Sequence, residues 1–380
     1  MSLSGLRVAL FSGNYNYVRD GANQALNRLV DYLLRQGAEV RTYSPVVAEP
    51  AFEATGPVVN VPAIPIPGRS EYRFAVSLSR KARKDLALFA PRVVHVASPD
   101  ILCHRAVTWA RKRDIPVVAS VHTRFETYPR YYRMKFLEPA MLRGLKRFYG
   151  RCDALIAPSQ GMVSLLQEQG MGDDVSLWTR GVDRNVFHPD KRDMAWRRAR
   201  GIADDDRVIG FLGRLVMEKG LDVFAETIAK LKRDDVAHRV LVIGEGPARE
   251  WFANALPGAV FSGHLAGEDL GRAVASLDML FNPSVTETFG NVTLEAMACA
   301  LPVVAAAATG SNSLVEDGVS GQLVEPTSVT GFADALSVYL RDDELAARHG
   351  AAGERRAASY DWDTVNSAVA DTYQRLLRDQ

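Results

Sequence analysis

Short apolar runs of four to six residues alternate along the whole chain with longer segments of helical periodicity. This alternation predicts strands joined by helices, and therefore parallel sheets covered by helices. The clearest helix is residues 22–36, which has apolar side chains at helical spacing and is followed by the stop residue Gly37. The clearest strands are Arg7–Phe11, Glu39–Tyr43, Val93–Val96, Val117–Val121 and Ala154–Ala157 in the first half, and Val208–Leu212, Val240–Ile243, Met279–Phe281, Pro302–Ala305 and Gln322–Val324 in the second.

The two groups of strands predict two domains. Turn-forming residues cluster between Arg180 and Pro189, directly after the strand-like Val175–Trp178, and this cluster indicates the boundary. The chain has 380 residues and 47% hydrophobic content, enough for two ordinary cores. We therefore expect an α/β protein with two Rossmann-like, doubly wound domains, residues 1–180 and 181–360, and a final helix at about 361–377 that packs on the first domain.

A pair of glutamates brackets a predicted helix start. The run Glu-Thr-Phe-Gly-Asn-Val-Thr-Leu-Glu extends from Glu287 to Glu295 and contains one glycine, Gly290. Glycine lets the backbone approach a ligand closely, and the N–H groups of Gly290, Asn291 and Val292 at a positive helix terminus favour a phosphate. The two carboxylates then suit hydroxyls of a sugar and of a ribose, although two glutamates taken alone are more often a solvated helix residue and a loop charge.

Two cations occupy a second loop. The apolar run Val208–Leu212 is followed by Gly-Arg-Leu-Val-Met-Glu-Lys-Gly, which places Arg214 and Lys219 between a predicted strand and a predicted helix. In open α/β sheets, ligands bind at the carboxyl ends of the strands. The two loops together therefore indicate a site for an anionic nucleotide sugar.

The net charge of the chain is only +1, but it is unevenly distributed. Residues 1–180 contain 25 Lys and Arg against 15 Asp and Glu, whereas residues 181–380 contain 21 against 30. The basic first half indicates an anionic partner, such as a membrane surface or nucleic acid, or electrostatic docking between the two halves.

The cysteines indicate the compartment. Cys103, Cys152 and Cys299 are far apart and lack metal-ligand spacing, which favours a reducing cytosol. No basic, apolar leader precedes the first predicted strand, and no stretch approaches the roughly 18 apolar residues of a spanning helix. We expect a chain that is neither exported nor integral to a membrane.

Four motifs together resemble a known family. RGVDRNVFHP, GRLVMEKG, ETFGNVTLE and ATGSNSLVEDGVSGQLVEP look like those of the retaining nucleotide-sugar glycosyltransferases of the GT-B fold, in the family 4-like group that includes bacterial phosphatidylinositol mannosyltransferases. The match extends over nearly the whole chain. It implies two domains that face each other across a cleft, with the donor mostly on the C-terminal side and the acceptor on the N-terminal side.

The resemblance also implies roles for individual residues. Arg214 and Lys219 match the pair that grips the donor diphosphate, Glu287 the glutamate that contacts the transferred sugar, and Glu295 the one that contacts the ribose. His122, after the strand 117–121, matches a histidine near the reacting sugar, although a lone histidine is more often structural. The remaining positions that we expect to contact the donor are Gly21, Gly213, Gly244, His264, Phe289, Gly290, Asn291 and Val292.

The family pattern has one visible departure. Many members carry a Gly-Gly pair after the first strand, whereas the loop from Asn14 to Gly21 ends in a single glycine. The departure lies at the entry of the helix that the resemblance places near the donor.

The expected chemistry is charge stabilisation. A departing nucleoside diphosphate develops negative charge, which Arg214 can stabilise as a bidentate donor and Lys219 as a point charge. The residues alone do not identify a nucleophile, and the resemblance implies retention by substitution on the same face. No metal cofactor is expected, because the Asp-x-Asp spacings at 204–206 and 361–363 favour a polar turn and a helix cap.

Basic amphipathic segments indicate where an acceptor comes from. Residues 130–151 carry apolar side chains on one helical face and basic ones on the other, and a second basic run, 80–84, belongs to a predicted helix Tyr72–Phe89. The alternative is an ordinary surface helix that buries its apolar face in its own domain, but an outward basic face still attracts anionic lipid. We expect a cytoplasmic protein peripheral to the inner face of the membrane, with a lipid or glycan acceptor; no motif indicates nucleic-acid binding.

The predicted reaction is transfer of a hexose or hexuronic acid from a nucleoside-diphosphate sugar to an acceptor hydroxyl. The rivals are a sugar-nucleotide epimerase and a non-catalytic sugar-nucleotide-binding protein on the same fold. A dinucleotide oxidoreductase is disfavoured, because neither the loop after the first strand nor Gly244–Arg249 carries the Gly-x-Gly-x-x-Gly pattern.

Overall fold

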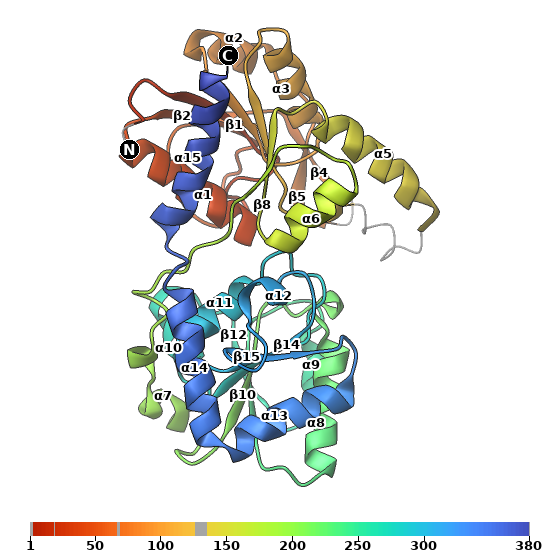
Figure 1. The fold of residues 1–380 in the computed structure, drawn as a ribbon, viewed down its shortest axis with the longest axis vertical. Coiled ribbons are helices and arrows are strands. Elements are labelled where there is room, and N and C mark those ends of the chain that lie inside the picture. Colours follow the sequence, from red (N-terminus) through yellow and green to blue (C-terminus); the bar gives the residue numbers. More distant parts are fainter. Residues whose placement is uncertain (1–2, 19, 67–68, 126–134, 380) are drawn as a thin grey trace. The chain divides into compact units, whose positions relative to one another are not determined.

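The computed structural model describes residues 3–18, 20–66, 69–125 and 135–379. The chain divides into two compact units: Met1–Thr179 together with Trp362–Gln380, and Arg180–Asp361. We call them the N-terminal unit and the C-terminal unit (Figure 1).

The N-terminal unit contains a seven-stranded parallel sheet. Its strands lie in the order β3 (Val58–Asn60), β2 (Glu39–Ser44), β1 (Arg7–Phe11), β6 (Val93–Val96), β7 (Val117–Ser120), β8 (Ala154–Ala157) and β9 (Val175–Leu177). Alternate strand residues enter two separate apolar cores, one under each face. One core is covered by α2 (Arg80–Phe89), α3 (Ile101–Arg111), α5 (Glu138–Tyr149) and α6 (Gln160–Glu168), and the other by α1 (Gly21–Arg35) and α15 (Trp362–Arg378).

The C-terminal unit repeats this architecture with a six-stranded parallel sheet. Its order is β12 (Val260–Gly263), β11 (Arg239–Ile243), β10 (Val208–Leu212), β13 (Met279–Asn282), β14 (Val303–Ala306) and β15 (Gly321–Val324). One face packs on α7 (Met194–Arg198), α10 (Gly267–Ala275), α11 (Asn291–Ala298), α12 (Ser311–Leu314) and α14 (Asp343–Ala357), and the other on α8 (Leu221–Arg233), α9 (Arg249–Ala255) and α13 (Val329–Arg341). The prediction of two Rossmann-like domains is confirmed.

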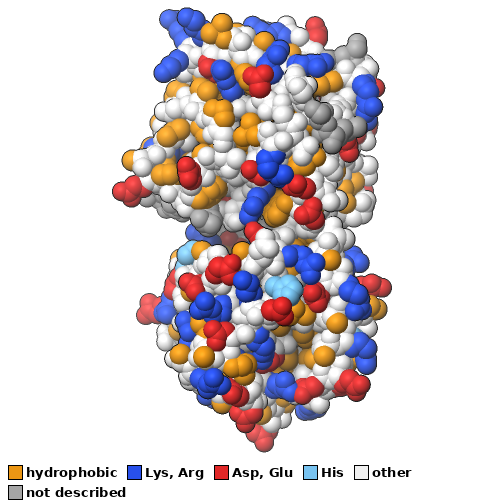
Figure 2. Space-filling view, turned by 90° about the vertical axis from the view of Figure 1, so that its left-hand side faces the viewer, with side chains coloured by type: hydrophobic (Ala, Val, Ile, Leu, Met, Phe, Trp, Pro, Cys, Tyr) orange, Lys and Arg blue, Asp and Glu red, His pale blue; other side chains and the backbone are white. Residues whose placement is uncertain are grey.

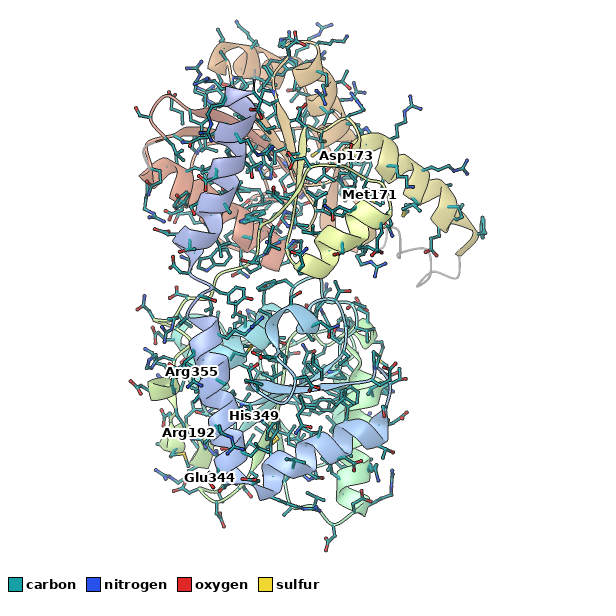
Figure 3. The ribbon with its side chains drawn as sticks, in the orientation of Figure 1. Met171, Asp173, Arg192, Glu344, His349 and Arg355 are labelled. Carbon is teal, nitrogen blue, oxygen red and sulfur yellow. The ribbon has the colours of Figure 1, made fainter. Side chains whose placement is uncertain are left out.

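The final helix belongs to the N-terminal unit although it follows the C-terminal unit in sequence. Helix α15 lies beside α1, where Asp363 forms an ion pair with Arg35 and Asn366 Nδ2 donates to the carbonyl of Arg28 at 3.1 Å (Figure 1). Helix α14, directly before it, stays in the C-terminal unit and carries Glu344, His349 and Arg355 (Figure 3).

One predicted helix is wrong in its first part. The segment Tyr72–Phe89 was expected to be helical throughout, but Arg69–Ala75 forms β5, which pairs antiparallel with β4 (Ala63–Ile66). The helix begins only at Arg80, because the Ser79 side chain accepts the backbone N–H of Ala82 and caps it. The basic run therefore lies in the first turns of a ten-residue helix.

Residues 181–380 contain more acidic than basic residues, but the visible face of the C-terminal unit is not uniformly acidic. Figure 2 shows acidic and basic side chains interspersed there. The ion pairs of the C-terminal unit include Lys191–Glu268 and Arg184–Glu354. Exposed pairs of this kind contribute little to stability.

Candidate functional site

The strand order of the C-terminal unit creates a switch point. The chain proceeds from β10 through β11 to β12 in one direction, and then restarts at β13 on the other side of β10. The loops after β10 and β13 therefore diverge at the carboxyl edge of the sheet, where open α/β sheets form their ligand crevice. These are the two loops that the sequence singled out.

Lys219 and Glu287 meet between these loops. Lys219 Nζ lies 2.6 Å from Glu287 Oε1, with 27% and 17% of the two side chains exposed. Lys219 ends the short 3-10 helix η4 (Met217–Lys219), and the Thr286 hydroxyl donates to the carbonyl of Glu218 at 3.2 Å. A cation from one loop and a carboxylate from the other are thus fixed at the switch point.

Arg214 lies in the same loop as Lys219 but differs from it in exposure and in ion pairing. Its side chain is exposed, and it forms no ion pair within the described part of the chain. A guanidinium that is free of structural partners can bind an anionic ligand without first breaking an internal bond.

Gly213 and Gly244 determine the shape of the site's floor. A Cβ on Gly244 would lie 1.9 Å from the Gly213 carbonyl oxygen, and Gly244 has φ +144°. The backbones that leave β10 and β11 are therefore in direct contact, which no larger residue at position 244 permits. Their part in donor binding stays a prediction.

The start of α11 matches the sequence-based expectation. Gly290 caps the helix with φ 103°, and the helix itself begins at Asn291. No side chain caps this end, so the N–H groups of its first turn point out of the helix and favour an anion.

The turn at Gly310, which was not among the predicted site residues, packs against the loop that carries Glu287. A Cβ on Gly310 would lie 2.8 Å from the Cβ of Glu287 and 2.9 Å from the carbonyl carbon of Phe289. The segment from Thr309 to Ser311 follows β14 and so packs against the glutamate loop. Its signal in the sequence was the glycine in ATGSNS, which belongs to one of the quoted motifs.

The carboxyl of Glu295 has an unusual electrostatic environment. Burial, with a smaller contribution from the charge of Glu287, raises the pKa of Glu295 from 4.5 to about 8. This shift favours the protonated form of Glu295 in the free protein. A protonated carboxyl can donate as well as accept, so it remains compatible with a ribose diol.

The other expected donor contacts lie in varied settings. His264 is exposed directly after β12. Phe289 is only 3% exposed and packs on the Tyr360 ring, so its side chain belongs to the core of the C-terminal unit. Gly21 and His122 belong to the N-terminal unit: Gly21 is the first residue of α1, and His122 follows β7 by two residues.

The two Asp-x-Asp spacings have structural partners. Asp204 pairs with Arg198 and Asp206 with Arg239, in the turn before β10. Asp363 pairs with Arg35 in the first turn of α15. In the described part of the chain, no three His, Cys, Asp or Glu side chains are grouped to hold a metal ion. That the reaction needs no metal stays a prediction.

Comparison with known proteins decides the family. The family model described as Glycosyltransferase Family 4 matches residues 19–186, and that described as Glycosyl transferases group 1 matches residues 206–342. A GDP-mannose-dependent alpha-mannosyltransferase of Mycolicibacterium smegmatis is 31% identical over 98% of this chain and 98% of its own length. The chain belongs to the family of glycosyltransferases that these two models and this relative represent.

One further relative and one solved structure are also similar to the transferase. Sulfoquinovosyl transferase SQD2 of Arabidopsis thaliana is 30% identical over 96% of the chain and 72% of its own length. The solved structure of sucrose-phosphate synthase from Thermosynechococcus elongatus superimposes with a TM-score of 0.80 at 19% identity, over 99% of this chain and 100% of that one. This likeness supports the GT-B fold.

No helix among the described residues of the transferase is both long and apolar enough to cross a membrane.

Proposed function

We propose that the transferase moves a hexose or hexuronic acid from a nucleoside-diphosphate sugar to an acceptor hydroxyl, with retention of anomeric configuration and without a metal cofactor. The observation that carries this proposal is the Lys219–Glu287 pair at the switch point. It supplies one group for a diphosphate and one for a sugar, beside the open end of α11.

The geometry suggests where each part of the donor lies. The diphosphate occupies the start of α11 and contacts Arg214 and Lys219, so that Lys219 exchanges part of its bond to Glu287 for a phosphate oxygen. The released carboxylate of Glu287 then accepts from sugar hydroxyls, and Glu295 contacts the ribose. As the diphosphate departs, the two cations stabilise the charge that develops on it.

The names of the relatives support a hexose-like donor. One is described as GDP-mannose-dependent and another as a sulfoquinovosyl transferase. Because these names point to different sugars, they do not select a base or a sugar for this chain.

A donor panel tests the proposal. Thermal unfolding and calorimetric titration with UDP-, GDP- and ADP-sugars, each with and without EDTA, should show one donor that stabilises the protein equally in both conditions. Products with and without an acceptor then separate the alternatives: an epimerase converts the sugar nucleotide alone, and a binding protein shows no turnover. NMR of the product reports the anomeric configuration, and an inverted product would contradict retention.

We further propose that the acceptor is a membrane lipid or glycolipid. The transferase would then be a cytoplasmic protein that binds peripherally to the membrane. In α5, Leu145 and Phe148 are buried, so this helix packs on its own unit. The sequence analysis gave such packing as one of the alternatives. The cations of the helix are exposed, and so are two apolar side chains near its start: Phe136, just before the helix, is 77% exposed and Met141 36% exposed. Residues 130–134 of the predicted basic segment lie outside the described residues.

Charge reversal tests this docking. Replacing Arg143, Lys146 and Arg147 by Glu should abolish flotation with anionic vesicles at low salt, because about six charge units of attraction, each worth roughly 1 kcal/mol near the surface, are removed. Nucleotide-sugar binding should persist. The matched control reverses three exposed cations of the C-terminal unit, Lys232, Arg233 and Arg341, and should still float. If the unaltered protein stays unbound at low salt, the membrane proposal is wrong.

A further inference from the structure

A buried polar cluster joins α15 to the centre of the N-terminal sheet. His95 of β6 is fully buried, with its Nδ1 2.5 Å from the Tyr373 hydroxyl of α15 and its Nε2 2.9 Å from the Ser120 hydroxyl of β7. Burial lowers the pKa of His95 to about 3, so the ring is neutral at physiological pH. One ring nitrogen then donates and the other accepts, which the two hydroxyls can both satisfy.

Trp178 extends this cluster. Its indole N–H donates to Asn366 Oδ1 of α15 at 3.2 Å, and both side chains are at most 1% exposed. Trp178 is the last residue but one before the chain leaves the N-terminal unit, whereas Asn366 lies one turn after the chain returns to it. The hydrogen bond therefore joins the segment that precedes the C-terminal unit to the helix that follows this unit.

The indole of Trp178 also contacts two histidine rings. Its centroid lies 6.2 Å from the ring of His95 at an interplanar angle of 74°, and 5.5 Å from the ring of His122 at 64°. Both contacts are edge-to-face arrangements, which aromatic pairs prefer. His122 thus packs on a ring that α15 holds in place.

The surroundings make this arrangement specific. Around the cluster lie apolar side chains from both the sheet and α15, among them Val118, Ile156 and Val369. A polar atom left without its partner in such a core costs about 1–3 kcal/mol, so the indole cannot rotate away from Asn366 cheaply. The orientation of Trp178 is therefore determined by side chains of a helix almost 190 residues further along the chain.

We propose that α15 is the positioning element for His122: Asn366 and Tyr373 hold Trp178 and His95, and the Trp178 ring fixes the orientation of the His122 imidazole. The inference rests on the proposed function only where it concerns turnover, through the expected place of His122 near the transferred sugar. Trp178, Asn366 and Tyr373 are positioning residues and touch no substrate.

The test compares two conservative variants, Trp178→Phe and Tyr373→Phe, by NMR and by kinetics. The His122 ring resonance, assigned with His122→Gln, should shift in Trp178→Phe and by less in Tyr373→Phe. The kcat should fall about tenfold in Trp178→Phe with little change in the donor KM, because misorientation affects the reacting geometry and not donor binding.

A control on the same helix separates positioning from docking. Arg375→Ala removes the 2.6 Å ion pair between α15 and Asp174 without touching the rings, and should leave both the His122 resonance and kcat unchanged. If the His122 resonance is the same in Trp178→Phe as in the unaltered protein, the positioning role is wrong. If it moves but His122→Gln turns over normally, the part of the inference that concerns transfer is overturned, and with it the role proposed for His122.

Should Trp178→Phe not fold, Tyr373→Phe decides alone. It removes a single hydroxyl from the cluster and keeps the ring. A His122 resonance that does not respond to it would then contradict the proposal.

Discussion

Replacing Lys219 by alanine is expected to lower kcat at saturating donor by two orders of magnitude or more. The lysine is held at the switch point by Glu287 at 2.6 Å. In the proposed donor position its ammonium lies where the leaving diphosphate develops charge. Loss of one such preorganised donor typically raises the barrier by about 3 kcal/mol. The loss should appear in kcat more than in KM, because the interaction strengthens as the bond to the sugar breaks.

Arg214→Ala should give a loss of similar size for a simpler reason. Arg214 is exposed and forms no ion pair within the described residues, so its removal disturbs no internal bond. The Lys219 variant, in contrast, leaves the Glu287 carboxylate without its partner, and Glu287→Gln measures that effect separately.

Steady-state kinetics and denaturant unfolding of each variant provide the measurement. Lys230→Ala is the control, because it removes an ion pair with Asp234 on α8, away from the loops, and should leave kcat unchanged. A variant at position 214 or 219 that retains near-normal kcat at saturating donor shows that its residue does not stabilise the leaving group.

The fold could be predicted because its central strands are buried on both faces. Strands β8 and β14 consist of buried residues throughout, and such runs are visible in a sequence as uninterrupted apolar segments. The failure at Tyr72–Phe89 has the opposite cause. Strand β5 is formed by pairing with β4, a tertiary contact that no local pattern reports, and Ser79 separates it from the helix that the spacing did indicate.

The meeting of the two loops could be predicted in part, whereas the roles of their residues stay predictions. Lys219 was recognised because its loop follows a predicted strand, and Glu287 because it precedes a predicted helix start at Gly290. The parallel sheet brings the two loops to one edge. The support from Gly310 and the ring contact between Trp178 and His122 were not foreseen, since each joins segments distant in sequence. The unusual protonation of Glu295 follows from burial, which spacing along a helix does not reveal.

That protonation leads to a pH-dependent result: Glu295→Gln should stabilise the protein increasingly as the pH rises. The folded-state pKa of Glu295, about 8, lies above its ordinary value of 4.5, so the folded protein binds the proton more tightly than the unfolded chain does. Below about pH 4.5 both states are protonated and burial of the group costs little. Between about pH 4.5 and 8 the unfolded chain loses its proton first, and stability falls as the pH rises.

Glutamine has nearly the same shape as glutamate and stays neutral throughout. The difference in the free energy of unfolding between Glu295→Gln and the unaltered protein should therefore be small at pH 5 and grow to roughly 2 kcal/mol or more at pH 8.5. Urea unfolding at pH 5, 7 and 8.5 measures it. Glu250→Gln, an exposed glutamate on α9, is the matched control and should show no such trend. A Glu295→Gln difference that is the same at all three pH values would show that Glu295 is ionised in the folded protein at neutral pH, and that the ribose would meet a carboxylate and not a carboxylic acid.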